Sequence, residues 1–111
     1  MARINSKRKG TAGEREFAAF CRTFGYDVRR TAQYNGKELE SKADVVGIPG
    51  IHAEVKRVER LNVSDAVAQA VRDCKKDETP VVFHRKNGEE WLATMRAAEW
   101  FELYERKGEN Q

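Results

Sequence analysis

The sequence predicts an α/β fold in which a mixed β-sheet of about five strands is flanked by helices. Stretches with apolar residues three and four positions apart, which are typical of helices, alternate with short runs in which valine recurs, which are typical of strands. The expected order is helix, three strands, helix, two strands, helix. Helices interspersed with strands bury their apolar faces best by packing on a sheet.

The composition favours one soluble domain spanning residues 1–111. Its 111 residues suffice for a modest core, and a charged content of 35% implies much hydrated surface, so we expect the core to be completed by dimerisation. The chain has no apolar run of membrane-spanning length and starts with a polar, basic segment. We therefore expect no membrane association and a location in the cytoplasm of a bacterial, archaeal or phage-infected cell.

Positive charge is concentrated at the amino-terminal end. Residues 1–30 contain eight basic and three acidic side chains, whereas the whole chain has a net charge of +3. Residues 1–10 are expected to form a basic arm. Such asymmetry indicates an anionic partner, most commonly nucleic acid, although a solvated tail would explain Ser6–Lys9 equally well.

The first elements can be assigned from their periodicity. A helix is expected from Thr11 to Phe24, ending at Gly25, followed by a strand from Tyr26 to Thr31. The apolar stripe of this helix comprises Phe17, Phe20, Cys21 and Phe24. The polar segment 32–42 is long for a small domain, which makes it a candidate binding loop.

Two short strands, 43–46 and 51–57, surround a Gly-Ile-Pro-Gly turn. The second alternates, with Ile51, Ala53 and Val55 on one face and His52, Glu54 and Lys56 on the other. Such a polar face is consistent with a solvated salt bridge or with a metal-dependent nuclease site.

The second half of the chain continues this pattern. A helix capped by Asn62 or Ser64 is expected to run to about Cys74, with an inner face formed by Val63, Val67, Ala70, Val71 and Cys74. Residues 80–85 and 90–95 flank an Asn-Gly turn and predict a hairpin. The last helix is expected from about Arg96 to Lys107, and it contains Trp100, Phe101 and Tyr104.

The nuclease interpretation rests on Asp44, Glu54 and Lys56. Hard cations such as Mg²⁺ take carboxylate and carbonyl oxygens as ligands, so Asp44, Glu54 and the carbonyl of Val55 are candidate ligands. A lysine can stabilise charge that develops on a phosphate. The Glu-x-Lys triplet alone is weak evidence, because the chain contains two further copies, at 40–42 and 105–107.

Asp44 and Glu54 can bind the same metal ion only if the hairpin has a particular register. Opposed residues of antiparallel strands share a face, so Asp44 meets Glu54 only if the connecting loop has an odd length, with Gly47 opposite Ile51. The glycines and proline at 47, 49 and 50 make such a loop feasible.

The first helix supplies a further acidic residue. Thr11 and Glu14 fit a capping box, in which Glu14 would have a purely structural role. Glu14 and Glu16 flank the apolar stripe at comparable angles, so helical periodicity does not choose between them.

Other reactive residue types favour structural roles. Cys21 and Cys74 are expected to be buried, reduced thiols, and zinc is not expected because neither has a cysteine or histidine at ligand spacing. Neither His52 nor His84 has a cysteine or serine at catalytic spacing. Three large aromatic residues are expected in the core or a dimer contact: Trp91, Trp100 and Phe101.

Four segments together resemble a known family. They are KGTAGERE at the start of the first helix, RRT at the end of the first strand, KADVVG and HAEVKR. They are similar to Holliday junction resolvases of archaeal and phage type, in the PD-(D/E)xK nuclease superfamily, over residues 7–75. Ala43 stands where the superfamily motif has proline, and the region after residue 80 has no obvious counterpart in the archaeal enzymes.

The resemblance implies a restriction-endonuclease-like three-layer core and a Mg²⁺-dependent site, with Mn²⁺ able to substitute. It implies Asp44 and Glu54 as metal ligands, Lys56 as the catalytic lysine and Glu14 as a further acidic residue of the site. Gln69 resembles a glutamine that some members hold near the site. The implied DNA contacts are Lys7, Arg8, Lys9, Arg15, Arg29 and Arg30.

The expected function is therefore a metal-dependent endodeoxyribonuclease that resolves four-way (Holliday) DNA junctions as a homodimer. Two alternatives are a nuclease of the same fold acting on other branched or duplex DNA, and a non-catalytic DNA-binding protein of that fold.

Overall fold

The structure is a computed structural model and describes residues 6–31 and 41–109. The order of its helices and strands is the predicted one. The elements are α1 (Ser6–Arg22), β1 (Arg29–Arg30), β2 (Val45–Val46), β3 (Ile51–Arg57), α2 (Val63–Asp73), β4 (Thr79–Arg85), β5 (Leu92–Thr94) and α3 (Ala97–Glu109).

The five strands form one mixed sheet in the order β1-β2-β3-β4-β5. Strands β3 and β4 are parallel, and the other neighbouring pairs are antiparallel. Helix α2 makes the crossover between the two parallel strands, which cannot be joined by a tight turn. The predicted hairpin around the Asn-Gly turn is confirmed as the β4–β5 pair.

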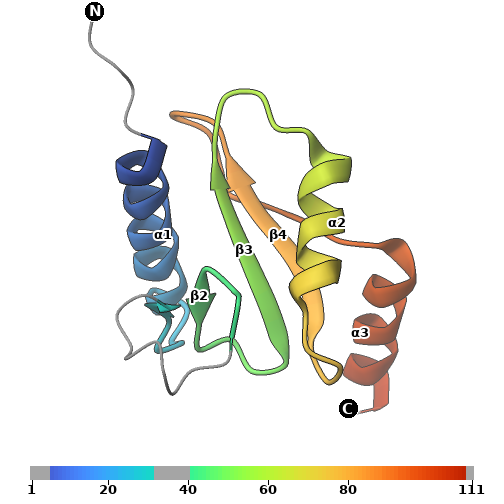
Figure 1. Cartoon of the computed structure of the whole chain (residues 1–111). Coiled ribbons are helices and arrows are strands. Elements are labelled where there is room, and N and C mark those ends of the chain that lie inside the picture. Colours follow the sequence, from blue (N-terminus) through green and yellow to red (C-terminus); the bar gives the residue numbers. More distant parts are fainter. Residues whose placement is uncertain (1–5, 32–40, 110–111) are drawn as a thin grey trace, which may run out of the picture.

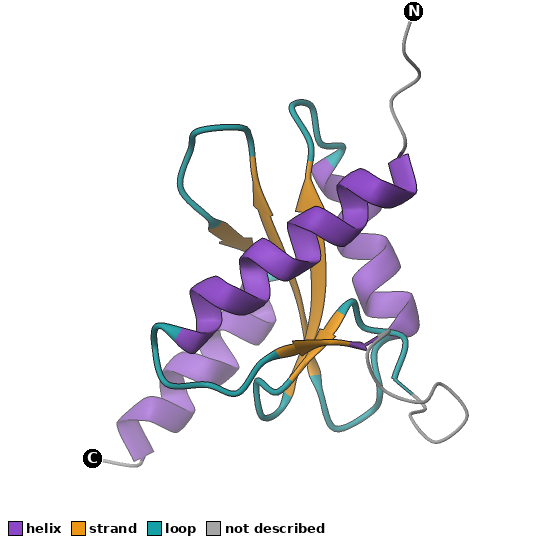
Figure 2. Cartoon of the chain, turned by 90° about the vertical axis from the view of Figure 1, so that its left-hand side faces the viewer, coloured by secondary structure: helices purple, strands orange, loops and turns teal. Residues whose placement is uncertain are grey.

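Helices cover both faces of the sheet (Figures 1 and 2). Helix α1 lies across one face, while α2 and α3 lie on the other side. The core under α1 contains Phe17, whose ring contacts Phe83 and Trp91 with centroids 4.5 and 5.1 Å away. A smaller apolar cluster joins Ala66 and Ala70 of α2 to β4. The expected core position of Trp91 is therefore confirmed.

Helix α1 begins at Ser6, five residues before the predicted start at Thr11. Lysine and arginine favour helix, which explains why the basic segment continues it. The part of the expected basic arm from Ser6 to Gly10 is thus helical, and Thr11 lies inside the helix. The capping-box interpretation of Glu14 is wrong for this reason.

Three predicted members of apolar faces are exposed: Phe20, Phe24 and Val63. Helix α1 ends at Arg22, so Phe24 falls in the following turn and is largely exposed. Val63 is the first residue of α2 and is also exposed. The predicted start and end of α2 agree closely with the structure. Asn62 is the N-cap residue, and its side chain accepts a hydrogen bond from the Asp65 amide. The predicted polar loop 32–42 falls mostly on residues 32–40, outside the described residues.

The loop between β2 and β3 has the odd length that shared ligation requires. Val45 pairs with Ala53, a register that places Asp44 opposite Glu54. Gly47 adopts a φ of +115°, and a Cβ at this position would lie 2.4 Å from the carbonyl oxygen of Asp27. Only glycine fits this crowded conformation, so the turn sequence determines the register.

Strands β1 and β2 are shorter than predicted, with two residues each. The side chain of Asp44 bonds to the amide of Val55, where a longer β2 would have offered a backbone carbonyl. The backbone amide of Asp44 still donates to the Ala53 carbonyl at 3.0 Å, so Asp44 is held against β3 through both its backbone and its side chain. Among the described residues, no helix is long and apolar enough to cross a membrane.

Candidate functional site

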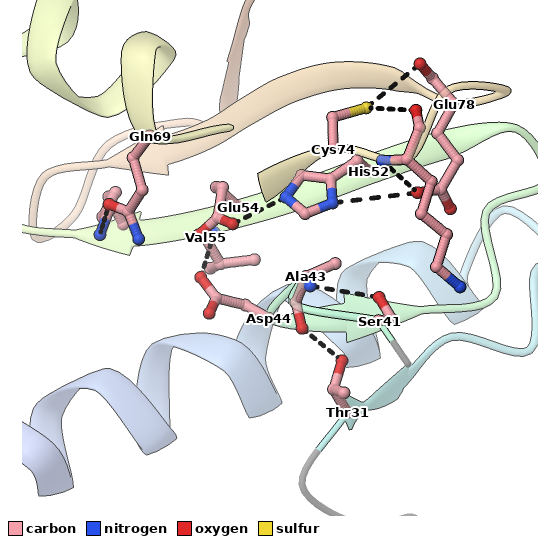
Figure 3. A network of polar contacts seen from close by, with 12 residues as sticks. Thr31, Ser41, Ala43, Asp44, His52, Glu54, Val55, Gln69, Cys74 and Glu78 are labelled. Carbon is pink, nitrogen blue, oxygen red and sulfur yellow. Dashed lines mark hydrogen bonds and ion pairs between the residues drawn. The ribbon is translucent and has the colours of Figure 1, made fainter. Parts of the chain in front are cut away.

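Asp44 immediately precedes β2 and lies against β3, and neighbouring residues fix its position (Figure 3). Its carboxylate oxygen Oδ2 accepts a hydrogen bond from the Val55 amide at 2.8 Å. Thr31 holds the preceding backbone through its hydroxyl, which donates to the Ala43 carbonyl at 2.6 Å, and through its amide, which donates to the Asp44 carbonyl at 3.0 Å. These contacts give Asp44 a defined orientation before any ligand binds.

Glu54 is buried in the face of β3 that α2 covers. Its residue is 1% exposed, so the solvated salt-bridge interpretation of this face is wrong. Burial, followed by the negative charge of Asp44 and a hydrogen bond with it, raises the pKa of Glu54 to about 8. Lys56 opposes this rise only partly. Two carboxyl groups thus share a site with little positive charge to balance them.

Lys56 extends from the same face of β3 and meets α2. Its Nζ donates a hydrogen bond to Oε1 of Gln69 at 3.3 Å. Gln69 therefore lies beside the candidate catalytic lysine, as the family resemblance implies. The amide oxygen restrains the ammonium group without neutralising its charge, which leaves the charge available to an anionic ligand.

Glu14 approaches from α1, on the other face of the sheet. Its carboxylate accepts a hydrogen bond from Arg30 Nε at 3.1 Å. Burial raises the pKa of Glu14, Arg30 opposes the rise, and the charges of Asp44 and Lys56 also act on it. Glu14 is therefore a candidate member of the site around Asp44 and Lys56.

Glu16, which periodicity left as an equal candidate, has a different environment. It forms ion pairs with Arg57 at 2.9 Å and Arg85 at 2.7 Å, joining α1 to β3 and β4. Gly13 allows this close packing, because a Cβ there would lie 2.9 Å from the Cβ of Arg57. The tight contact between α1 and β3 orients Glu14 toward the site and Glu16 away from it.

The carbonyl of Val55 is directed toward the site. In an extended strand, the amide and carbonyl of one residue point to the same neighbouring strand. Since the Val55 amide bonds to Asp44, its carbonyl faces the same edge. The candidate oxygen donors are therefore the carboxylates of Glu14, Asp44 and Glu54 and the carbonyl of Val55, and in the described residues the three carboxylates are not grouped closely enough to hold one ion.

The candidate DNA contacts have unequal environments. Arg15 and Arg29 are exposed, and Arg29 pairs with Asp27 at 3.2 Å. The side chain of Arg30 is 14% exposed and bonds to Glu14, so its first role here is to hold that carboxylate. The backbone of Lys7, Arg8 and Lys9 is helical, and their side chains lie outside the described residues.

His52 has an environment that sequence spacing did not indicate. The ring is completely buried, and its Nε2 lies 2.8 Å from Oε1 of Glu54. Burial lowers the pKa of His52, although the nearby carboxylates of Glu78, Asp73 and Asp44 oppose this, so the ring is neutral near pH 7.

The fold also places Cys74 and Glu78 beside His52. The expectation that neither histidine has a cysteine partner is therefore wrong for His52, because that spacing counts only residues near in sequence. It holds for His84, whose Nε2 bonds to Thr94 at 2.8 Å. Cys21 is buried as expected, whereas Cys74 is only partly buried, and both thiols are free.

Comparison of the chain with protein-family models, with curated proteins and with solved structures gave no match.

Proposed function

We propose that this chain is a divalent-metal-dependent endodeoxyribonuclease of the restriction-endonuclease-like fold, and that it resolves four-way DNA junctions. The observation that carries the proposal is that Asp44, immediately before β2, lies beside Glu54 of β3, and that the charges of Asp44 and Lys56 act on Glu14 of α1. A hairpin of even loop length would have separated Asp44 from Glu54. The chain instead adopts the one type of register that unites them.

The donor set fits Mg²⁺, and Mn²⁺ as a substitute. All the candidate donors are oxygen atoms, which these hard cations prefer. Glu54 and Asp44 repel each other in a buried position, as the raised pKa of Glu54 indicates. A divalent cation held by Asp44 and Glu54, with Glu14 and the Val55 carbonyl completing the site, would offset that repulsion. When bound, it would polarise the phosphate and acidify an attacking water.

The residues of the chain then have distinct tasks. Asp44 is oriented by the Val55 amide and Glu14 by Arg30, and a bound cation would draw these carboxylates together. The ammonium of Lys56, restrained by Gln69, stabilises negative charge on the phosphate in the transition state. Arg15 and Arg29 contact the phosphate backbone, which suits recognition of a DNA shape rather than a sequence.

A symmetric dimer follows from this function, because junction resolution takes paired cuts on symmetric strands. The aromatic residues of α3 offer the best surface for it. Trp100, Phe101 and Tyr104 are 47%, 55% and 61% exposed, and their rings contact one another. Exposed apolar clusters of this kind mark contact surfaces, and a second copy would cover this one.

Cleavage of a labelled four-way junction tests the proposal. The assay compares Mg²⁺ with chelator, and the wild type with Glu54→Gln and Asp44→Asn. Glu89→Gln, in the exposed β4–β5 turn, serves as a matched control. Paired symmetric nicks are expected in the wild type and control with Mg²⁺. Both site variants should bind the junction and fail to cut it.

Other outcomes identify the alternatives. Equal cutting of a linear duplex with the same arm sequences would indicate a general nuclease and not a junction resolvase. Tight junction binding without cleavage by the wild type, in Mg²⁺ or Mn²⁺, would indicate a non-catalytic binding protein.

A further inference from the structure

A second cluster of potential ligands lies next to the candidate nuclease site (Figure 3). His52 is in β3, Cys74 is the C-cap residue of α2, and Glu78 immediately precedes β4. One ligand atom from each lies within 4.8 Å of the other two. The turn from Cys74 to Glu78 is closed by a 3.1 Å bond from the Glu78 amide to the Lys75 carbonyl, which keeps the cysteine and glutamate adjacent.

The histidine supplies a second, independent observation that points to a ligand at this cluster. Its ring is 0% exposed, and Nδ1 has no hydrogen-bond partner among residues 6–31 and 41–109. That nitrogen points toward the cluster, 4.0 Å from Oε1 of Glu78, which is too far for a hydrogen bond. Buried polar atoms are nearly always bonded, so an unpaired nitrogen in this position calls for a partner.

We propose that His52 Nδ1, Cys74 Sγ and the Glu78 carboxylate bind one transition-metal ion of the zinc type. A mixed nitrogen, sulfur and oxygen donor set suits Zn²⁺ and not Mg²⁺. With metal–ligand bonds of about 2.0–2.3 Å, ligand atoms in a tetrahedral site lie roughly 3.3–3.8 Å apart, so a small inward movement forms the site. Three protein ligands leave a fourth position for water.

Binding requires the thiol of Cys74 to lose its proton. In the metal-free protein, Sγ donates to the backbone carbonyl of Glu78 at 3.1 Å and to that of Lys75 at 3.3 Å. On binding, the S–H bond breaks, its electron pair forms the metal–sulfur bond, and the proton goes to solvent. No oxidant or reductant takes part.

The position of this site connects it to Glu54. A metal on Nδ1 fixes the ring proton on Nε2, so His52 would donate a hydrogen bond to Glu54 along the existing 2.8 Å contact. This carboxylate–histidine–metal arrangement would orient Glu54. His52 is then a positioning residue, and occupancy of the zinc-type site controls cleavage. This coupling rests on the proposed function, whereas the binding of the metal does not.

Cobalt(II) provides the direct test on the full-length protein. A thiolate-to-cobalt charge-transfer band and intense ligand-field bands are expected for the wild type, and Zn²⁺ should abolish them by displacement. Cys74→Ser should lose the charge-transfer band and bind Zn²⁺ more than about 100-fold more weakly, a larger loss than changes outside the ligand set cause. Glu78→Gln is a second ligand variant, because this side chain is partly exposed and glutamine keeps an oxygen that can accept from the Lys75 amide.

Two control variants make the result specific. Cys21→Ala removes the other thiol and should keep the charge-transfer band. Asp44→Asn removes a proposed Mg²⁺ ligand and should also keep it, which assigns the thiolate signal to the second site. Absence of the band in the wild type, or its persistence in Cys74→Ser, would overturn the proposed metal site.

The two proposals fail separately. A wild type that shows the thiolate band but never cuts DNA would refute the nuclease function and leave the metal site standing. Mg²⁺-dependent cleavage by a wild type with no band would refute the metal site alone. If both hold, Zn²⁺ should change the cleavage rate of the wild type at saturating Mg²⁺, and Cys74→Ser should abolish that response. A response of equal size in Cys74→Ser would overturn the coupling.

Discussion

Replacing Glu54 by glutamine is expected to stabilise the metal-free protein at pH 8. Burial, then the charge of Asp44, raises the pKa of Glu54 from 4.5 to about 8. Because folding raises this pKa, the folded protein holds a proton between those values that the unfolded chain has lost. The contribution of this group to the free energy of unfolding is therefore greatest below pH 4.5 and falls as the pH rises to about 8.

The size of the effect follows from the two pKa values. One pKa unit corresponds to about 1.4 kcal/mol, so the full interval from 4.5 to about 8 corresponds to roughly 5 kcal/mol. Of this, the wild type loses roughly 4 kcal/mol between pH 4.5 and pH 8, because the unfolded and the folded group are each half titrated at one end of that range. Glutamine has nearly the same shape and does not ionise, so Glu54→Gln should lose none of this. The gap between the two proteins should therefore widen by roughly 4 kcal/mol between pH 4.5 and pH 8.

Urea unfolding in the presence of chelator, followed by circular dichroism across this pH range, measures the gap. Glu89→Gln, in the exposed β4–β5 turn, should follow the wild type at every pH. Parallel stability curves for the wild type and Glu54→Gln would refute the buried, repelled carboxyl group. Adding Mg²⁺ at pH 8 should stabilise the wild type and leave Glu54→Gln unchanged, because only the wild type has the full set of carboxylates.

Three further predictions concern the turn, the lysine and the dimer. Gly47→Ala should lower the free energy of unfolding, measured in urea, by about 3 kcal/mol, because the position is crowded and has positive φ. Gly50→Ala should lower it by only about 1 kcal/mol, because Gly50 has positive φ but lies in open space. Lys56→Ala should lower the single-turnover cleavage rate roughly 100-fold with junction affinity unchanged. Gln69→Ala, which only frees the lysine, should lower it roughly tenfold, and equal losses would contradict the positioning role. Trp100→Ala should shift the sedimentation-equilibrium mass from dimer toward monomer, and an unchanged mass would exclude this surface.

The sequence alone determined the features that depend on neighbouring residues. The alternation along residues 51–57 predicted that His52, Glu54 and Lys56 share a face of β3, and the pairing register agrees. The Gly-Ile-Pro-Gly turn allowed the odd loop that places Asp44 opposite Glu54. Turn geometry and strand pleating act over a few residues, so the local sequence contains the information they need.

Tertiary structure alone decided which surfaces are buried and which distant residues meet. Periodicity placed Glu14 and Glu16 symmetrically, but the packing of α1 on β3 directs one to the site and the other to Arg57 and Arg85. The strand pattern could not distinguish a solvated face from one that α2 covers.

The same limit applies to the second cluster. Residues at positions 52, 74 and 78 converge only because α2 returns the chain to a strand parallel to β3. Burial and electrostatic interaction depend on what lies nearby in space, and in a crossover fold those neighbours come from distant parts of the chain.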